Sequence, residues 1–499
     1  MKLEYDVVIV GSGAGGGTIA DRLIPLAKKG AKIAILESGP YYPHEYFTQR
    51  EIEMLSLMRN NGAWPTVDGS ITVAAGEAVG GSTLMYTGVT FKANDEVIRQ
   101  WGIPDLTPED LKPRFNKLWK EVNVIEPKSD MINDNNKLFK EGCDKLGWKV
   151  EKINLNLKDC NQEGFCNIGC ATGGKQGVLE VQLPKAAKAG IEIIPNFSVD
   201  RVENSTVYGT VKKTPPDTKP GKLQPGDVEI KAKRIILAAG SPGSPAILIR
   251  SGFNKKFSGL GRYITLHPAL TVYGIYPKPI KNYKGFPKTY YTAKFSDSHD
   301  HYIETAFYYP FVSTKHLGLW GTNLRDTMKK YNNFMCMIIL NHDKSNYDNM
   351  VVLDKQKNPH IKYTLSNESI KSLCHAQAQA SRIMFAAGCE KALMPCGDRP
   401  IFSSKEVPDD KLEEFISPSN YLSVKVPIAS AHPQGGCRMG YSIDDSVTDS
   451  YGQVHGYPWL YVADASLFPH SSHVNPYLTV MALADRIAEN LINTSGKWA

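Results

Sequence analysis

The chain has 499 residues and a net charge of +7, with 42% hydrophobic and 22% charged residues. This length exceeds the roughly 250–300 residues of one compact core, so we expect two domains. The composition excludes disordered, collagen-like and coiled-coil proteins. We expect neither a transmembrane segment nor nucleic-acid binding, because no apolar run reaches roughly 18–20 residues and the basic residues form no block.

The N-terminal segment predicts a dinucleotide-binding unit. Residues 5–10 form a short β-branched run typical of a buried parallel strand, and the glycine-rich residues 11–16 follow directly. A helix over 18–23 and a second strand over 32–36 complete the unit, and Glu37 stands where an acid holds the adenosine ribose. Such a loop lets the main chain approach a pyrophosphate at a helix N-terminus. The predicted contacts are Gly11, Gly13, Ala14, Gly15, Gly16 and Glu37.

A cysteine-rich segment follows further along the chain. Cys160, Cys166 and Cys170 lie within eleven residues, interleaved with glycines. Thiolates bind iron–sulfur clusters, and glycine-rich wrapping lets main-chain amides bond the sulfurs, so we predict these three as ligands of a three-iron cluster. A four-iron cluster completed from elsewhere, a zinc site with a distant histidine, a disulfide with one spare thiol and three inert cysteines are the alternatives.

The remaining elements predict an interrupted cofactor domain. A glycine-rich run over 76–83 precedes short strands over 191–194 and 199–202 and a hairpin that begins at 207 and ends at 233. A strand, a glycine-rich turn and a helix follow over 235–250, and a final strand–helix unit covers 459–491. Residues 262–441 differ, because tyrosine, phenylalanine and alternating polar residues at 290–292, 307–309 and 335–341 suit a half-exposed antiparallel sheet covered by a helix over 366–387. We therefore predict an α/β fold in which a Rossmann-like domain carries an inserted, mainly antiparallel substrate domain. The cofactor domain takes residues 1–90, 185–262 and 442–499, and the substrate domain takes 91–184 and 263–441.

Four segments resemble the signatures of one family, the glucose–methanol–choline (GMC) oxidoreductases. They are residues 76–83, 240–252, 432–440 and 464–479. The resemblance covers nearly the whole chain and implies FAD in place of NAD. It extends the predicted FAD contacts to Gly80, Gly81, Ser82, Val199, Gly240, Asp464, Asn475 and Pro476. The chain has Tyr86 where the family often has asparagine, and no histidine near residues 80–88 to tether the flavin, so we predict non-covalent FAD.

The same resemblance implies the catalytic residues. His432 is the base that takes the hydroxyl proton, a role that suits a side chain with an unperturbed pKa of about 6.5. Asn475, at the start of the last helix, donates a hydrogen bond to the developing alkoxide, and that helix directs its positive end at the flavin. His473 is the rival for the second position. His267 and His470 are assigned structural roles.

These residues predict an FAD-dependent dehydrogenase that oxidises a sugar or polyol. A subset of such enzymes in the family carries a three-iron cluster in a cysteine segment like this one, so electrons would pass through the cluster to an acceptor protein or partner subunit. The alternatives are an oxygen-reducing oxidase without a cluster, a flavin-containing lyase and a non-catalytic electron-transfer subunit. The chain shows no signal peptide, so the expected location is the cytoplasm, although relatives with clusters are exported with a partner subunit.

Overall fold

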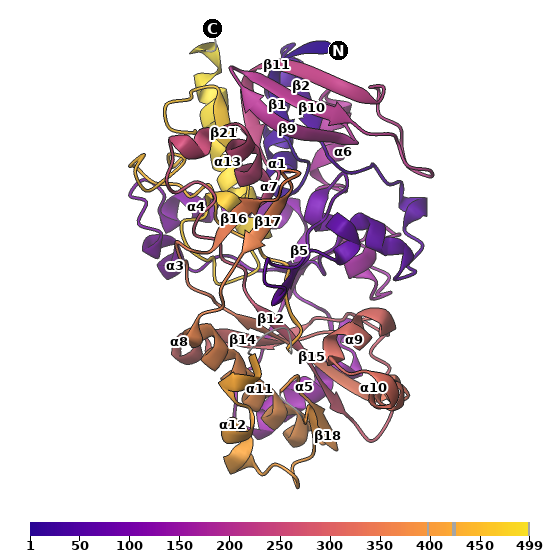
Figure 1. Cartoon of the computed structure of the whole chain (residues 1–499). Helices are drawn as coiled ribbons and strands as arrows, with labels where there is room; N and C mark the ends of the chain where they lie inside the picture. Colours follow the sequence, from indigo (N-terminus) through magenta and orange to yellow (C-terminus); the bar gives the residue numbers. More distant parts are fainter. Residues whose placement is uncertain (397–398, 422–425, 498–499) are drawn as a thin grey trace.

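The computed structural model describes residues 1–396, 399–421 and 426–497. It shows a mixed α/β fold with two large sheets: one in the upper half, beside both chain termini, and one in the lower half (Figure 1). The predicted fold class is confirmed. The assignment of segments to the two domains remains a prediction.

The upper sheet has seven strands in the order β8-β2-β1-β11-β10-β9, with β21 pairing to β11. Its core is parallel, because β1 pairs in parallel with β2 and β11, β2 with β8, and β11 with β21. The predicted hairpin over 207–233 is confirmed by the antiparallel pairing of β10 with β11. The strands are β1 (Lys2–Val10), β2 (Ile33–Leu36), β8 (Glu192–Ile194), β9 (Phe197–Glu203), β10 (Thr206–Val211), β11 (Gly226–Leu237) and β21 (Leu460–Val462).

Helices from distant parts of the chain surround this sheet. Helix α1 contacts α13 and α6, and α13 also contacts α4, so the two ends of the chain pack together. The sequence explains α13, because most of its side chains are apolar and twelve of its residues are buried. The helices are α1 (Ala14–Arg22), α4 (Pro108–Glu121), α6 (Gln182–Lys188), α7 (Gly243–Arg250) and α13 (Tyr477–Thr494).

The lower sheet has nine strands, seven of them in the order β19-β18-β12-β15-β14-β13-β6. All its pairs are antiparallel except that of β20 with β3, and β20 also pairs with β12. Its strands are β3 (Ile71–Val73), β6 (Glu151–Lys152), β12 (Ala269–Ile275), β13 (Tyr290–Thr292), β14 (His301–Thr305), β15 (Phe334–Asn341), β18 (Lys391–Leu393), β19 (Ile401–Phe402) and β20 (Ile428–Ser430).

Two details of the lower sheet differ from the prediction. Every residue of β15 is buried, because α11 (Asn367–Ala387) and α5 (Asp134–Lys145) pack against the strand, so it is not half-exposed. Residues 307–309 are not a strand, because β14 ends at Thr305 and Pro310 opens α9 (Pro310–Leu317). The predicted helix over 366–387 is confirmed, and Ser366 caps it by accepting a hydrogen bond from the Ser369 amide.

Smaller elements fill the space around the two sheets. Strands β4, β7 and β5 form a three-stranded sheet, and β16 pairs with β17. Their bounds, with those of the remaining helices, are β4 (Val89–Thr90), β5 (Val124–Ile125), β7 (Asn154–Asn156), β16 (Met350–Leu353), β17 (Pro359–Lys362), α2 (Ile24–Lys28), α3 (Asp95–Gln100), α8 (Ser296–His299), α10 (Gly321–Met328) and α12 (Leu412–Phe415).

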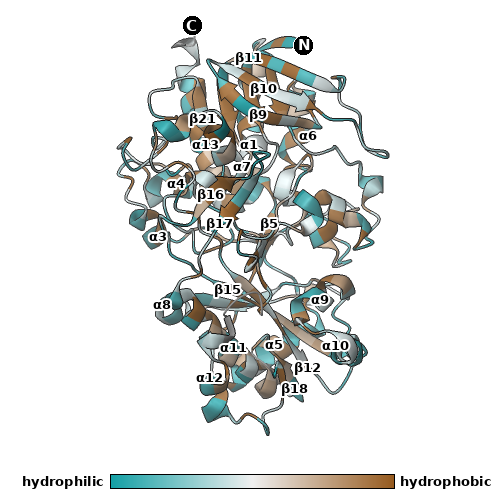
Figure 2. Ribbon diagram, in the orientation of Figure 1, coloured by the Kyte–Doolittle hydropathy of each residue, from teal (hydrophilic) through white to brown (hydrophobic). Residues whose placement is uncertain are grey.

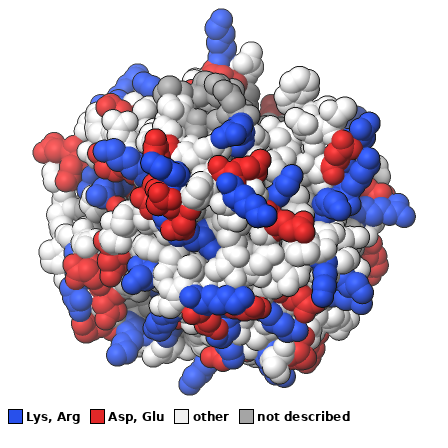
Figure 3. All heavy atoms as spheres, turned by 90° about the horizontal axis from the view of Figure 1, so that it is seen from below, with Lys and Arg blue, Asp and Glu red and all other residues white. Residues whose placement is uncertain are grey.

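The surface follows from the composition. Figure 2 shows the outer helix α3 largely hydrophilic, whereas α13 is mainly hydrophobic. On the face seen in Figure 3, acidic and basic side chains are interspersed. Within the residues that the structure describes, no helix is long and apolar enough to cross a membrane.

Candidate active site

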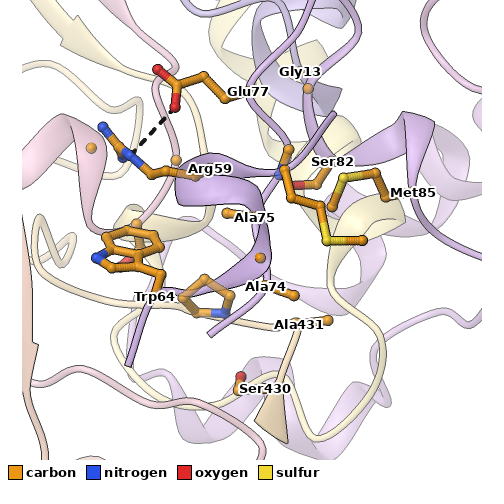
Figure 4. Close-up of a pocket in the computed structure, with 18 of the residues that line it drawn as sticks. Gly13, Arg59, Trp64, Ala74, Ala75, Glu77, Ser82, Met85, Ser430 and Ala431 are labelled. Atoms are coloured by element: carbon orange, nitrogen blue, oxygen red, sulfur yellow. Dashed lines mark hydrogen bonds and ion pairs between the residues drawn. The ribbon is translucent and has the colours of Figure 1, made fainter. Parts of the chain in front are cut away.

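One cavity of about 1070 Å³ connects the two sheets. It is lined by residues that follow the carboxyl ends of β1, β2 and β11 in the upper sheet and by residues of β12, β15 and β20 in the lower one. Open parallel sheets bind ligands at the carboxyl ends of their strands. Figure 4 shows Gly13 and Ser82 on one side of the pocket and Trp64, Ser430 and Ala431 on the other.

Main chain forms the wall of the cavity at the start of α1. Gly13 is the N-cap of α1 and has no side chain to bond the first amides of the helix, which are left as free donors. The main chain at Gly81 packs against Gly13, because a Cβ atom on Gly13 would lie 3.8 Å from the Gly81 Cα and a Cβ on Gly81 would lie 2.7 Å from the Gly13 Cα. This bare cradle of amides at a helix N-terminus fits the pyrophosphate of a dinucleotide.

The neighbouring glycines pack the chain against itself. A Cβ atom on Gly15 would lie 1.7 Å from the Ala463 carbonyl oxygen, and one on Gly16 would lie 1.9 Å from the Gly11 carbonyl oxygen. Gly11 has a φ of +102°, and a Cβ atom there would lie 2.3 Å from the Ala238 carbonyl oxygen. These glycines therefore let α1 pack closely against the ends of β1, β11 and β21. The space in front of the start of α1 is thereby left open for a ligand.

Two carboxylates on the cavity wall brace its loops. Glu37 accepts hydrogen bonds from the Ser12 amide and hydroxyl, at 3.0 and 2.7 Å, and from the Gly39 amide. Asp464 accepts from the Gly240 amide at 2.9 Å, and its other oxygen caps the turn at Ser466. Burial raises the pKa of both carboxyls. The sequence interpretation gave these acids to the cofactor, and in the structure both also fix main chain around it.

Most of the predicted cofactor contacts line this cavity. They are Gly11, Gly13, Ala14, Gly15, Glu37, Gly81, Ser82, Val199, Gly240, Asp464, Asn475 and Pro476. Gly16 and Gly80 stand just behind its wall: Gly16 packs against Gly11, and Gly80 packs against Leu84 and Leu179. A dinucleotide such as FAD therefore fits the arrangement, although the role of each residue remains a prediction.

His432 and Asn475 meet in the wall of the cavity. The Asn475 Nδ2 atom lies 3.3 Å from the His432 Nε2 atom, and Asn475 immediately precedes Pro476, the N-cap of α13. Burial, followed by the positive charge of Lys288, lowers the pKa of His432 to about 3. The imidazole is therefore neutral near pH 7, which is the form that can accept a proton.

His267 holds the other side of the His432 ring. The Nδ1 atoms of the two histidines are 3.3 Å apart, and the His267 Nε2 atom lies 2.5 Å from the Ser471 hydroxyl. His267 has a φ of +49° and is 2% exposed. The contact between the two Nδ1 atoms fixes the His432 ring so that its Nε2 atom faces Asn475. His267 therefore contacts the predicted base as an orienting group, a role that the sequence interpretation did not give it.

His473 lies outside the cavity. Its φ of +57° turns the chain away, and its ring stacks on His342 with centroids 5.1 Å apart. Asn475, which faces His432 directly, occupies the second position of the predicted pair. No signal around residue 473 of the sequence indicates this left-handed conformation.

The three predicted metal ligands come together without forming a metal site. Cys160, Cys166 and Cys170 are close enough for their charges to affect one another, yet all are free thiols. The Cys160 and Cys170 sulfurs accept main-chain hydrogen bonds from Gln162 and Lys175, at 3.4 and 3.3 Å. Burial raises the pKa of Cys166 to about 12, which favours the thiol over the thiolate that metals bind. Within the described part of the chain, no set of three or more His, Cys, Asp or Glu residues could hold a metal ion. The structure does not support the predicted cluster.

Lys288 is a cavity residue that sequence reasoning missed. It lies just before β13, and its charge affects the pKa of His432. The chain has 58 lysine and arginine residues, and no motif marks this one. His267 did carry a signal, since it precedes a proline and lies close to a strand, but that pattern does not indicate what the ring contacts.

Comparisons with known proteins match this architecture to one family. Two sequence profiles described as GMC oxidoreductase match residues 54–269 and 346–484. A long-chain-alcohol oxidase of Arabidopsis thaliana, FAO3, is 27% identical over 98% of this chain and 69% of its own length. An uncharacterized GMC-type oxidoreductase of Sinorhizobium fredii, y4nJ, is 27% identical over 100% of this chain and 96% of its own length.

Solved structures show the same fold. A pyridoxine 4-oxidase has a TM-score of 0.71 at 16% identity and covers 98% of this chain and 99% of its own. A variant of formate oxidase from Aspergillus oryzae has a TM-score of 0.74 at 15% identity and covers all of both chains.

Proposed function

The chain belongs to the GMC oxidoreductase family, and we propose that it is an FAD-dependent oxidase that converts an alcohol to a carbonyl compound and passes the electrons to oxygen. The observation that carries the proposal is the contact between His432 and Asn475 in the cavity that also exposes the amide cradle of α1. The alcohol oxidases among its relatives favour oxygen as the acceptor over a partner protein.

The side chains around this contact can activate a hydroxyl group. FAD, when bound along the cavity, supplies the hydride acceptor. Neutral His432 accepts the hydroxyl proton, and the amide of Asn475 donates a hydrogen bond to the substrate oxygen as negative charge develops on it. His267 holds the His432 imidazole ring in place from its other side. The first turn of α13 has no capping side chain, so its positive end also faces the cavity beside Asn475.

The bound flavin is proposed to be non-covalent. The cavity residues from Gly81 to Val89 include serine, threonine, methionine and tyrosine but no histidine or cysteine that would bond the isoalloxazine ring. Acid precipitation of the purified protein should therefore release the yellow colour into the supernatant. Colour that stays entirely in the protein pellet would contradict this.

The test is anaerobic reduction of the purified yellow protein with a panel of alcohols, followed by admission of air. We expect an alcohol to bleach the flavin, and we expect oxygen to restore the colour with formation of hydrogen peroxide. If no alcohol bleaches the flavin, the proposal fails and a flavin-containing lyase is favoured. If bleaching occurs but oxygen does not restore the colour, the acceptor is not oxygen.

A dehydrogenase is the second candidate. It would need an electron-relaying three-iron cluster on Cys160, Cys166 and Cys170, which lie near one another but which, among the described residues, are not arranged as a metal site. Iron analysis and electron paramagnetic resonance of the oxidised protein distinguish the two. Three irons per chain with a matching signal would favour the dehydrogenase, and iron-free protein that produces peroxide would favour the oxidase.

A further inference from the structure

A buried ion pair stands at the wall of the cavity. The Lys288 Nζ atom lies 3.0 Å from the Glu304 Oε2 atom, and the two side chains are only 10% and 1% exposed. Removing two charges from water carries a large desolvation cost, which their mutual attraction has to offset. A pair this costly indicates a function at its position.

The two partners face different environments. Lys288 lines the cavity, whereas Glu304 lies on β14 behind it and does not reach the cavity surface. The ammonium group has three N–H donors, and its bond to Glu304 is the one hydrogen bond that it makes within the described residues. Donors are therefore available toward the cavity.

Lys288 lines the same cavity as His432, the predicted base. Its charge contributes to the lowered pKa of His432, so the two groups lie within electrostatic range. Tyr308 and Thr271 line the same cavity, and Lys288 also lowers the pKa of Tyr308, which burial raises. Lys288, Tyr308 and Thr271 thus form a polar patch that a substrate held at His432 would meet, and we call it the second-oxygen patch.

We propose that Lys288 donates a hydrogen bond to a second oxygen of the substrate, and that the substrate is a neutral alcohol carrying a further hydroxyl group away from the reacting carbon. Glu304 acts as a positioning residue that holds the ammonium and cancels its charge. A hydroxyl oxygen accepts an N–H without disturbing this balance, whereas a substrate carboxylate would add a second anion to a buried pair that is already neutral. The inference rests on the proposed alcohol oxidation, whose substrate it narrows.

The experiment compares hexanol with hexanetriol in the FAD-loaded protein. Lys288→Met gives an unbranched side chain one heavy atom shorter and removes the donors. We expect kcat/KM for hexanetriol to fall roughly 10- to 100-fold, because a site built to bond a hydroxyl loses its preference when the donor is removed, while kcat/KM for hexanol changes less than about threefold. Lys140→Met, which removes the lysine of an exposed pair with Asp144, is the matched control and should change neither value.

Glu304→Gln provides a second variant if Lys288→Met folds poorly. It leaves the ammonium without its counter-charge, so hydroxyhexanoate should gain relative to hexanetriol. Because each result is a ratio of two substrates for one preparation, the fraction of folded protein cancels. Equal losses for hexanol and hexanetriol in Lys288→Met, or no change in the ratio for either variant, would overturn the inference.

A failure of the proposed function gives a different result. In that case no alcohol bleaches the flavin of the unsubstituted protein, and binding is read from the change in the visible flavin spectrum on titration with hexanetriol. A spectral titration that Lys288→Met abolishes supports the second-oxygen patch without turnover, and one that Lys288→Met leaves unchanged refutes it.

Discussion

Two regions of the cavity wall, here called its α1 end and its side-chain end, differ in that one is formed by main chain and the other by side chains. At the α1 end the wall is main chain, with Gly13 and Gly81 facing each other and the carboxylates of Glu37 and Asp464 turned toward loop amides. At the other end the wall is side chains, with His432 between Asn475 and His267 and with Lys288 nearby. The α1 end therefore depends on glycines that leave the main chain uncovered, whereas the other end depends on the identity of its side chains. Binding and chemistry should therefore be separable by mutation.

The largest expected effect is at the side-chain end. His432→Ala removes the predicted base while leaving the α1 end unchanged, so flavin reduction by an alcohol should slow about 10²- to 10⁴-fold with FAD still bound. Stopped-flow absorbance measures the reduction, and the flavin-to-protein ratio measures occupancy. Near-normal reduction would remove His432 from the mechanism, and loss of FAD would show that the two ends are not independent.

A smaller effect is expected at the main-chain end. Gly13 has an ordinary φ of −72°, and a Cβ there would meet no atom of the chain closer than 3.8 Å. Gly13→Ala should therefore leave the thermal stability of the apoprotein unchanged but weaken FAD binding roughly tenfold or more, because the methyl group occupies the place of the pyrophosphate. Fluorescence titration of the apoprotein with FAD gives the affinity. Unchanged affinity would mean that the pyrophosphate does not approach Gly13.

A further effect concerns the dependence of stability on pH. Burial lowers the pKa of His432 and of His342 to about 3, so below pH 6.5 the unfolded chain binds protons that the folded chain does not. This makes the histidine contribution to stability decline as pH falls from about 7 to about 3. The carboxyls of Glu37 and Asp464 act in the opposite direction, because their raised pKa values favour the folded state in acid.

His342→Phe tests this pH dependence. The His342 Nε2 atom is buried without a hydrogen-bond partner, so the substitution should not lower the Tm at pH 7.5. At pH 5 the substitution should raise the free energy of unfolding by about 2 kcal/mol relative to the unsubstituted protein. This pH lies roughly 1.5 units below the pKa of histidine in the unfolded chain, and each unit corresponds to about 1.4 kcal/mol. Thermal melts at both pH values measure it. An equally steep loss of Tm in acid for both proteins would exclude His342 as a contributor.

The predictable part of the fold lies where local sequence controls the main chain. The β-branched residues of β1, the glycines that follow it and the helical periodicity of α11 and α13 predicted those elements to within a few residues. The predicted exposure of β15 was wrong, because the number of layers covering a strand depends on helices far away in sequence. Residues 307–309 were mistaken for a strand because aromatic residues favour both strands and the packed turns that precede helices.

By itself the sequence determined that the chain binds a dinucleotide, that it belongs among the GMC oxidoreductases, and that His432 and Asn475 are the pair to examine. Glycine spacing and motif order carry this information, because they constrain the chain wherever it folds. Only the tertiary structure decided that His267 contacts His432, that His473 turns away and that Lys288 borders the cavity. These contacts depend on the register of the lower sheet and on two left-handed residues, and neither is encoded in the local pattern. The three cysteines illustrate the same contrast. Their spacing in the sequence predicted metal ligands, whereas their burial and their main-chain hydrogen bonds are set by the tertiary structure.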